Sequence, residues 1–180
     1  MSRLALALGA VWMLVGCGGG GGNTQPDAST PFLAFATDFT GYHSWQHYDT
    51  SDAGMLVGIH DGRPITEYIN DLPPHGSATF PIGTIVVKEV SGPEPDGGTH
   101  PVLAMVKRGG GFNSAGADGW EWFEIQPHAD AKDTVHVVWR GVGPPIGDTY
   151  GGDASAGCNV CHTDCGNDSV CAHALLLSNF

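Results

Sequence analysis

Basic residues are scarce in this chain of 180 residues. It has 7 Lys and Arg against 19 Asp and Glu, so its formal net charge is −12 with histidine neutral. Lys107 and Arg108 form the one place where two bases adjoin. Nucleic-acid binding needs clustered Lys and Arg to contact the phosphates. The sequence therefore predicts no nucleic-acid partner.

Long apolar runs are also few. Arg3 precedes the run LALALGAVWMLVG, and no second run of that length follows it. A membrane-spanning helix needs about 20 mostly apolar residues, so we interpret residues 1–16 as a signal peptide. The sequence LVGC, which ends at Cys17, resembles the bacterial lipobox, whose cysteine is acylated. The alternative is an ordinary secretory signal, and both interpretations export the protein.

The export signal predicts a protein of the cell envelope, facing the periplasm or the cell surface and contacting the membrane only through a lipid anchor at Cys17. Gly18 supplies no inner-membrane retention aspartate, which favours the outer membrane. Residues 17–30 are rich in glycine and lack apolar periodicity, so they predict a flexible tether. The remaining residues, 31–180, suit one folded domain.

Short apolar runs separated by Gly, Pro, Asp and Asn dominate residues 31–180. Their β-branched and aromatic content predicts a mainly β (α+β) domain with an antiparallel sheet and a few short helices. In the run that starts at Trp120, alternation puts Trp120, Trp122 and Glu124 on one face of the strand. Helical spacing predicts short helices in 65–72 and 169–177. The four clearest strand-like runs are 84–90, 102–107, 120–125 and 134–139.

The strongest chemical motif is Cys158-Asn159-Val160-Cys161-His162. C-x-x-C-H is the attachment motif of c-type haem. Two thiols at this spacing can add to the two vinyl groups of one porphyrin, and the adjoining imidazole can ligate the iron. The sequence therefore predicts one covalent haem c per chain, held by Cys158 and Cys161, with His162 as the metal ligand.

Other cysteine chemistry competes with haem. Cys158, Cys161, Cys165 and Cys171, together with His162 or His173, are ligand types that zinc accepts. Their spacings do not match the usual pair of zinc knuckles, and exported cysteines tend to be oxidised. A zinc site or two disulfides are the alternatives. If haem is present, Cys165 and Cys171 are not needed for it, and we predict that they form a disulfide rather than stay free or bind metal.

Several segments stand in a fixed order along the chain: Arg63 with TEYIN (66–70), FPIGTIVVKE (80–89), MVKR (105–108) with GFN (111–113), DGWEWF (118–123) and GCNVCH (157–162). In that order they resemble the cytochrome P-460 family, which is related to the cytochromes c′-beta. The resemblance implies a β-rich, usually homodimeric fold that holds a c-type haem with an open distal side. Cys165 and Cys171 depart from the family pattern.

The resemblance also implies a function. Family members oxidise hydroxylamine or bind nitric oxide and similar small ligands. In the enzymes a lysine is crosslinked to the porphyrin, and Lys88 matches that position; the alternative is an ordinary strand lysine. Oxidation also requires an electron acceptor and a base for the released protons. Glu89, Glu121 and Glu124 are the candidates for that base.

The leading hypothesis is therefore an exported, lipid-anchored oxidoreductase that handles hydroxylamine or small nitrogen oxides. One alternative is a non-crosslinked cytochrome that binds nitric oxide or transfers electrons. The other is a haem-free surface domain stabilised by disulfides or zinc. Arg63 is interpreted as a surface residue rather than a distal one, and Met105 as a core residue rather than a sixth iron ligand.

Overall fold

The computed structural model describes residues 30–51, 63–92, 100–130, 132–143 and 157–180. The predicted signal peptide, Cys17 and nearly all of the predicted tether lie outside the described residues.

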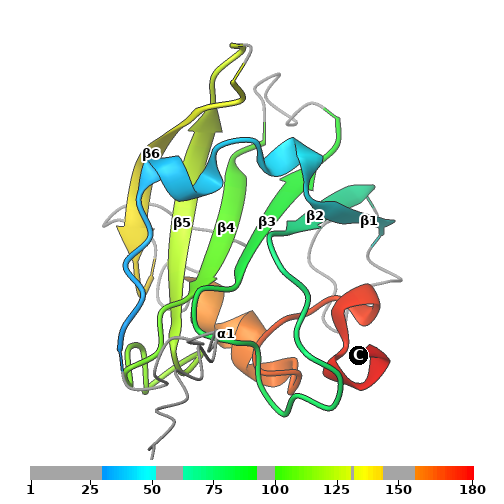
Figure 1. The fold of residues 1–180 in the computed structure, drawn as a ribbon, viewed down its shortest axis with the longest axis vertical. Helices are drawn as coiled ribbons and strands as arrows, with labels where there is room; N and C mark the ends of the chain where they lie inside the picture. Colours follow the sequence, from blue (N-terminus) through cyan, green and yellow to red (C-terminus); the bar gives the residue numbers. More distant parts are fainter. Residues whose placement is uncertain (1–29, 52–62, 93–99, 131, 144–156) are drawn as a thin grey trace, which may run out of the picture.

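Six antiparallel strands form one open sheet, and their spatial order is their order along the chain. This arrangement confirms the prediction of a mainly β, antiparallel domain (Figure 1). The four strands predicted from sequence are all present, whereas the first two strands were not predicted. The strands are β1 (Gln46–Thr50), β2 (Ile65–Ile69), β3 (Ile85–Val90), β4 (Val102–Lys107), β5 (Trp120–Pro127) and β6 (Val135–Gly141).

Both predicted helices are wrong. Residues 65–69 form β2, in which burial alternates with period two, because Ile65, Glu67 and Ile69 point into the protein. Residues 169–177 contain only the 3-10 turn η5 (His173–Leu175) and the start of a second, η6 (Leu177–Asn179). Asn167 explains the irregular course, because its side-chain amide bonds the backbone of Val170, Leu175 and Leu177.

The α-helix lies elsewhere, at α1 (Gly157–Asp164), and contains the whole C-x-x-C-H motif.

One face of the sheet is covered by the N-terminal segment, which carries the 3-10 turns η1 (Ala36–Phe39) and η2 (Tyr42–Ser44). Phe39 and Tyr42 are fully buried there against Val87, Phe123 and Ile125. Figure 1 shows these turns, in blue to cyan, crossing the strands. We call this side of the sheet the N-terminal face.

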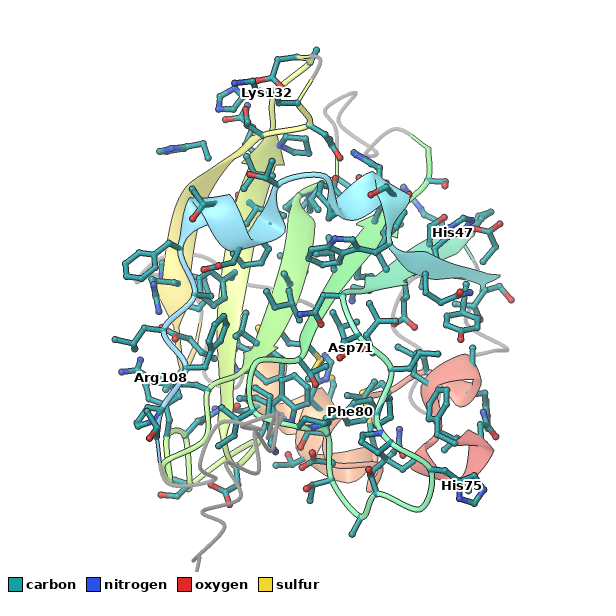
Figure 2. All side chains as sticks on the ribbon, in the orientation of Figure 1. His47, Asp71, His75, Phe80, Arg108 and Lys132 are labelled. Atoms are coloured by element: carbon teal, nitrogen blue, oxygen red, sulfur yellow. A yellow bond between two sulfur atoms is a disulfide. The ribbon has the colours of Figure 1, made fainter. Side chains whose placement is uncertain are left out.

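The opposite side is covered by α1 and the C-terminal turns, and we call it the C-terminal face. Trp120 and Trp122 of β5 pack here with Met105, Val170 and Leu175. The predicted alternation along β5 is thus confirmed, since Phe123 and Ile125 pack on the N-terminal face. Figure 1 shows the orange α1 near one end of the strands, and Figure 2 labels Phe80 at that end of the molecule and Lys132 at the other.

In the part of the chain that the structure describes, no helix is both long enough and apolar enough to cross a membrane.

Candidate functional site

The helix α1 brings the residues of the C-x-x-C-H motif to the C-terminal face. Cys158 and His162 are four residues apart and therefore lie on the same side of the helix, and both line a pocket against the sheet. Neither Cys158 nor Cys161 is in a disulfide. Burial raises the pKa of the Cys158 thiol to about 11, although the Lys88 ammonium acts in the opposite direction. The motif thus presents two thiols and an imidazole together.

The orientation of His162 is fixed by a backbone carbonyl. Its Nδ1 lies 2.7 Å from the carbonyl oxygen of Ser169, so Nδ1–H donates to that oxygen and the lone pair is on Nε2. The His162 ring also packs on Trp122, with ring centroids 4.6 Å apart. A second hydrogen bond from the non-ligating nitrogen is the usual support of a metal-binding histidine.

A strained loop holds that carbonyl in place. Asp168 and Ser169 both have positive φ, 48° and 68°, which costs a non-glycine residue on the order of 1–3 kcal/mol. The Asp168 carboxylate accepts hydrogen bonds from Lys107 Nζ at 2.7 Å and from the backbone N–H of Phe80 at 2.8 Å. Its carbonyl accepts one from Trp120 Nε1 at 2.6 Å. The loop is therefore anchored to β4, to β5 and to the segment between β2 and β3.

Cys165 and Cys171 close the same loop with a disulfide, and their Cα atoms are 5.2 Å apart. This is the pair that the sequence analysis proposed. Cys171 also lines the pocket, and its Sγ lies 3.4 Å from His162 Nδ1. The disulfide thus supports the residues behind the imidazole.

Asn159, between the two motif cysteines, attaches α1 to the sheet and its loops. Its Oδ1 accepts hydrogen bonds from Asn113 Nδ2 at 2.7 Å and from Trp122 Nε1 at 3.0 Å. Its Nδ2 donates to Asn113 Oδ1 and to the carbonyl of Val142. A Cβ at Gly116 would lie 2.4 Å from Asn159 Cγ, so this approach requires glycine.

The pocket between α1 and the sheet, counted to its open mouth, encloses about 550 Å³. Its lining is mostly apolar with a few polar groups, as is usual for ligand pockets. Two neighbouring rows of the sheet form its floor, one through Lys88 and Leu103 and the other through Val86, Met105 and Trp122. The remaining lining residues are Glu67, Ala104, Phe123, Trp139, Cys158, His162, Val170 and Cys171.

Glu67 is the pocket residue that the sequence analysis missed. Its side chain is 4% exposed, and burial raises its pKa to about 7 even though the Lys88 ammonium lowers it. Period-two alternation in Ile65-Thr66-Glu67-Tyr68-Ile69 would have placed Glu67 with the two isoleucines on the buried face. The helical interpretation of this segment hid that signal.

The structure brings some of the predicted site residues together and not others. Lys88 lines the pocket with Cys158 and His162. Glu124 stands in the row of Lys88, opposite Leu103, but is not among the lining residues.

Glu89 and Glu121 lie on the N-terminal face. Glu89 is hydrogen-bonded by the hydroxyls of Tyr42 and Tyr68 and contacts the His43 ring at 3.1 Å. Glu121 pairs with Arg108 and Arg140. The candidate bases named from sequence are thus absent from the pocket lining.

Met105 and Arg63 are the other two residues with a predicted position. Met105 is 5% exposed and belongs to the core, as predicted, yet it also lines the pocket. Arg63 is half-buried, hydrogen-bonds the His100 ring and does not line the pocket.

The residues present fit a c-type haem better than a zinc ion. The pocket offers Cys158 and an oriented His162 beside a large apolar wall, and Cys161 lies one helical turn from Cys158. Two of the four cysteines that a tetrahedral zinc site could use, Cys165 and Cys171, are bonded to each other. Among the described residues, no three His, Cys, Asp or Glu side chains are grouped so that they could hold a metal ion.

Comparisons with known proteins return nothing: no family model, no curated protein and no solved structure matches this chain.

Proposed function

We propose that the protein is a c-type haem protein that oxidises hydroxylamine or handles small nitrogen oxides. One observation carries the proposal: the C-x-x-C-H motif lies against a mostly apolar pocket with Cys158 and His162 in its wall. Cys158 and Cys161 would hold the porphyrin, and His162 would ligate the iron. Such a haem supplies an open iron coordination site and electron-transfer chemistry when bound.

The polypeptide contributes orientation and charge to this chemistry. The Ser169 carbonyl orients the His162 ring, and most of the pocket lining is apolar. Lys88 lines the same pocket as Cys158, which supports a lysine–porphyrin crosslink as in cytochrome P-460. The likeness to that family still rests on the sequence segments alone.

Several parts of the proposal concern residues or partners beyond the described pocket. Export, lipid anchoring through Cys17 and residence in the cell envelope follow from segment 1–30 of the sequence. An electron acceptor and a homodimer are proposed from the family resemblance. The haem-free alternative is disfavoured by the position of Cys158 and His162 in the pocket wall, with Cys161 on the same helix.

Met105 favours a second candidate, a low-spin electron carrier. Its side chain lines the pocket across from α1, and a methionine thioether can be the sixth ligand of a haem iron. The visible spectrum separates the two candidates, because a sixth Met ligand gives a low-spin spectrum that Met105→Leu converts to high spin. An open sixth position gives a high-spin spectrum from the start.

The decisive experiment is expression with a c-type haem maturation system, followed by pyridine haemochrome analysis. We expect covalent haem in the wild type and none in the Cys158→Ser/Cys161→Ser double variant. Cys165→Ser/Cys171→Ser is the matched control, since it removes the same number of sulfur atoms and should retain haem. Absence of covalent haem from the wild type would contradict the proposal.

Digestion of the holoprotein then tests the crosslink. A haem-bearing product that contains both the Cys158 peptide and the Lys88 peptide supports the enzyme, whereas haem on the Cys158 peptide alone supports the nitric-oxide-binding alternative. In the enzyme, Lys88→Ala should abolish turnover of hydroxylamine with an added electron acceptor.

A further inference from the structure

Glu67 is a buried carboxylate that the proposed haem attachment does not use. Among the buried side-chain nitrogen and oxygen atoms of the described residues, its Oε2 is the one without a hydrogen-bond partner. Such atoms are rare in folded proteins, because each costs about 1–3 kcal/mol and more when charged. An unpaired carboxylate oxygen therefore calls for a partner that the polypeptide does not itself provide.

The position of Glu67 points to the pocket as the source of that partner. Glu67 pairs in register with Lys88 of β3 and lines the pocket with it. Its neighbours on the same face of β2, Ile65 and Ile69, are fully buried and apolar. The titratable groups that face it from the packed elements are Tyr48 across β1, Lys88 across β3, and Cys158 and His162 on α1.

The other buried or half-buried carboxylates of the sheet show that this chain can satisfy such groups. Glu121 accepts hydrogen bonds from Arg140 Nε at 2.8 Å and Nη2 at 2.7 Å. Glu89 accepts from two tyrosine hydroxyls. Both lie on the N-terminal face, away from the pocket. Glu67 differs from them in lining a cavity, so its carboxylate borders the space that a ligand would occupy.

We infer that Glu67 is a specificity-determining residue whose Oε2 accepts a hydrogen bond from an N–H or O–H group of a small pocket ligand. The inference rests on the proposed function for the site at which that ligand binds, and it names the ligand class. The pocket would select hydrogen-bond donors such as hydroxylamine over donor-free molecules such as nitric oxide.

The pocket would discriminate between these ligands because a buried acceptor costs free energy when it has no hydrogen-bond donor. A ligand that donates to Oε2 satisfies a buried acceptor, whereas a ligand without a donor leaves it unsatisfied. Sites built to hydrogen-bond a substrate group discriminate strongly against analogues that lack the group, for this reason. Removing the carboxylate should therefore remove discrimination and not ligand binding in general.

The test uses the holoprotein without an electron acceptor, under anaerobic conditions, with hydroxylamine and nitric oxide as separate probes. Visible spectral titration gives the two dissociation constants. For Glu67→Leu we expect a weakening of hydroxylamine binding by at least about tenfold, with nitric oxide binding unchanged or tighter. Glu67→Gln keeps an acceptor oxygen, so its affinity for hydroxylamine should lie between those of the wild type and Glu67→Leu. Asp49→Asn, an exposed carboxylate on the neighbouring strand β1, is the control and should match the wild type.

A second readout does not depend on the folding of Glu67→Leu. The infrared difference spectrum of the wild type, with and without hydroxylamine, should contain a carboxyl band that shifts on binding and is absent from Glu67→Gln. Equal effects of Glu67→Leu on both ligands, or no effect on either, would overturn the inference while haem attachment stands. A wild type without covalent haem, as seen by haemochrome analysis, would overturn the proposed function and this inference with it.

Discussion

The two faces of the sheet treat buried carboxylates in opposite ways. On the N-terminal face, Glu121 is surrounded by two guanidinium groups and Glu89 by two tyrosine hydroxyls and a histidine. On the C-terminal face, Glu67 has a buried oxygen without a partner. The first face uses its polar groups to attach the N-terminal segment. The second face leaves one polar group available to whatever enters the pocket.

The largest effect is expected at Glu121, whose side chain is 4% exposed. Glu121→Gln removes the charge that pairs with Arg108 and Arg140, and breaking a buried ion pair from one side costs about 3–5 kcal/mol. Urea denaturation followed by tryptophan fluorescence should show a loss of unfolding free energy of that size. Gln126→Ala, an exposed position on the same strand, should change stability by less than about 0.5 kcal/mol. Equal losses in both variants would contradict the comparison.

The next effect concerns Glu67 and pH. Its pKa is about 7 in the folded protein against an ordinary value of 4.5, so the folded state holds the proton more tightly than the unfolded chain. The unfolding free energy should therefore fall as pH rises from about 4.5 to about 7, by about 3 kcal/mol. Glu67→Gln lacks this titration.

The measurement is urea denaturation of the haem-free chain and of Glu67→Gln at intervals from pH 4 to pH 8. The stability of the variant relative to the wild type should increase across this range and level off above pH 7. Parallel pH profiles for the two proteins would show that Glu67 is not an isolated buried acid.

A smaller effect is expected from the disulfide behind His162. Cys165→Ser/Cys171→Ser opens a loop with a sequence separation of 6, for which the chain-entropy model gives about 2 kcal/mol. The melting temperature should fall accordingly, and wild-type protein treated with a reductant should match the variant. A variant as stable as the oxidised wild type would mean that the anchors of Asp168 suffice to hold the loop.

The smallest effect is expected at Glu89, a candidate base from sequence. Glu89→Gln keeps an acceptor for the Tyr42 and Tyr68 hydroxyls, so the loss of stability should be about 1 kcal/mol. Because Glu89 lies on the face away from the pocket, we expect hydroxylamine turnover to stay within about twofold of wild type. A large loss of turnover would mean that Glu89 takes part in catalysis, and it would contradict the distinction between the two faces.

Much of the sheet could be predicted from local pattern. Runs such as Val102–Lys107 combine β-branched residues with nearby turn signals, and the structure has that strand with the same bounds. Segment 65–72 could not be assigned in the same way, because five residues of strand also fit a helical spacing. Only pairing with β3 decides between the two, and pairing is a long-range contact.

The candidate site was predictable in its chemistry but not in its surroundings. C-x-x-C-H is visible in the sequence because its spacing carries the chemistry, and the disulfide partners were predicted as the two nearby cysteines that haem does not need. The carbonyl of Ser169 and the carboxylate of Glu67 carry no such spacing. Each became a part of the site only through its position, the first by a strained turn and the second by strand alternation.

The sequence by itself determined the class of fold, the acidic character and the thiol and imidazole groups available for chemistry, since each depends on composition or on neighbours along the chain. The tertiary structure decided which groups meet. It set Cys158 and His162 against Lys88 and Glu67, and it turned Glu89 and Glu121 away, because alternate residues of a strand point to opposite faces of a sheet. Which side chains meet in the pocket depends on which segment packs on each face of the sheet, and that packing is decided only by the whole fold.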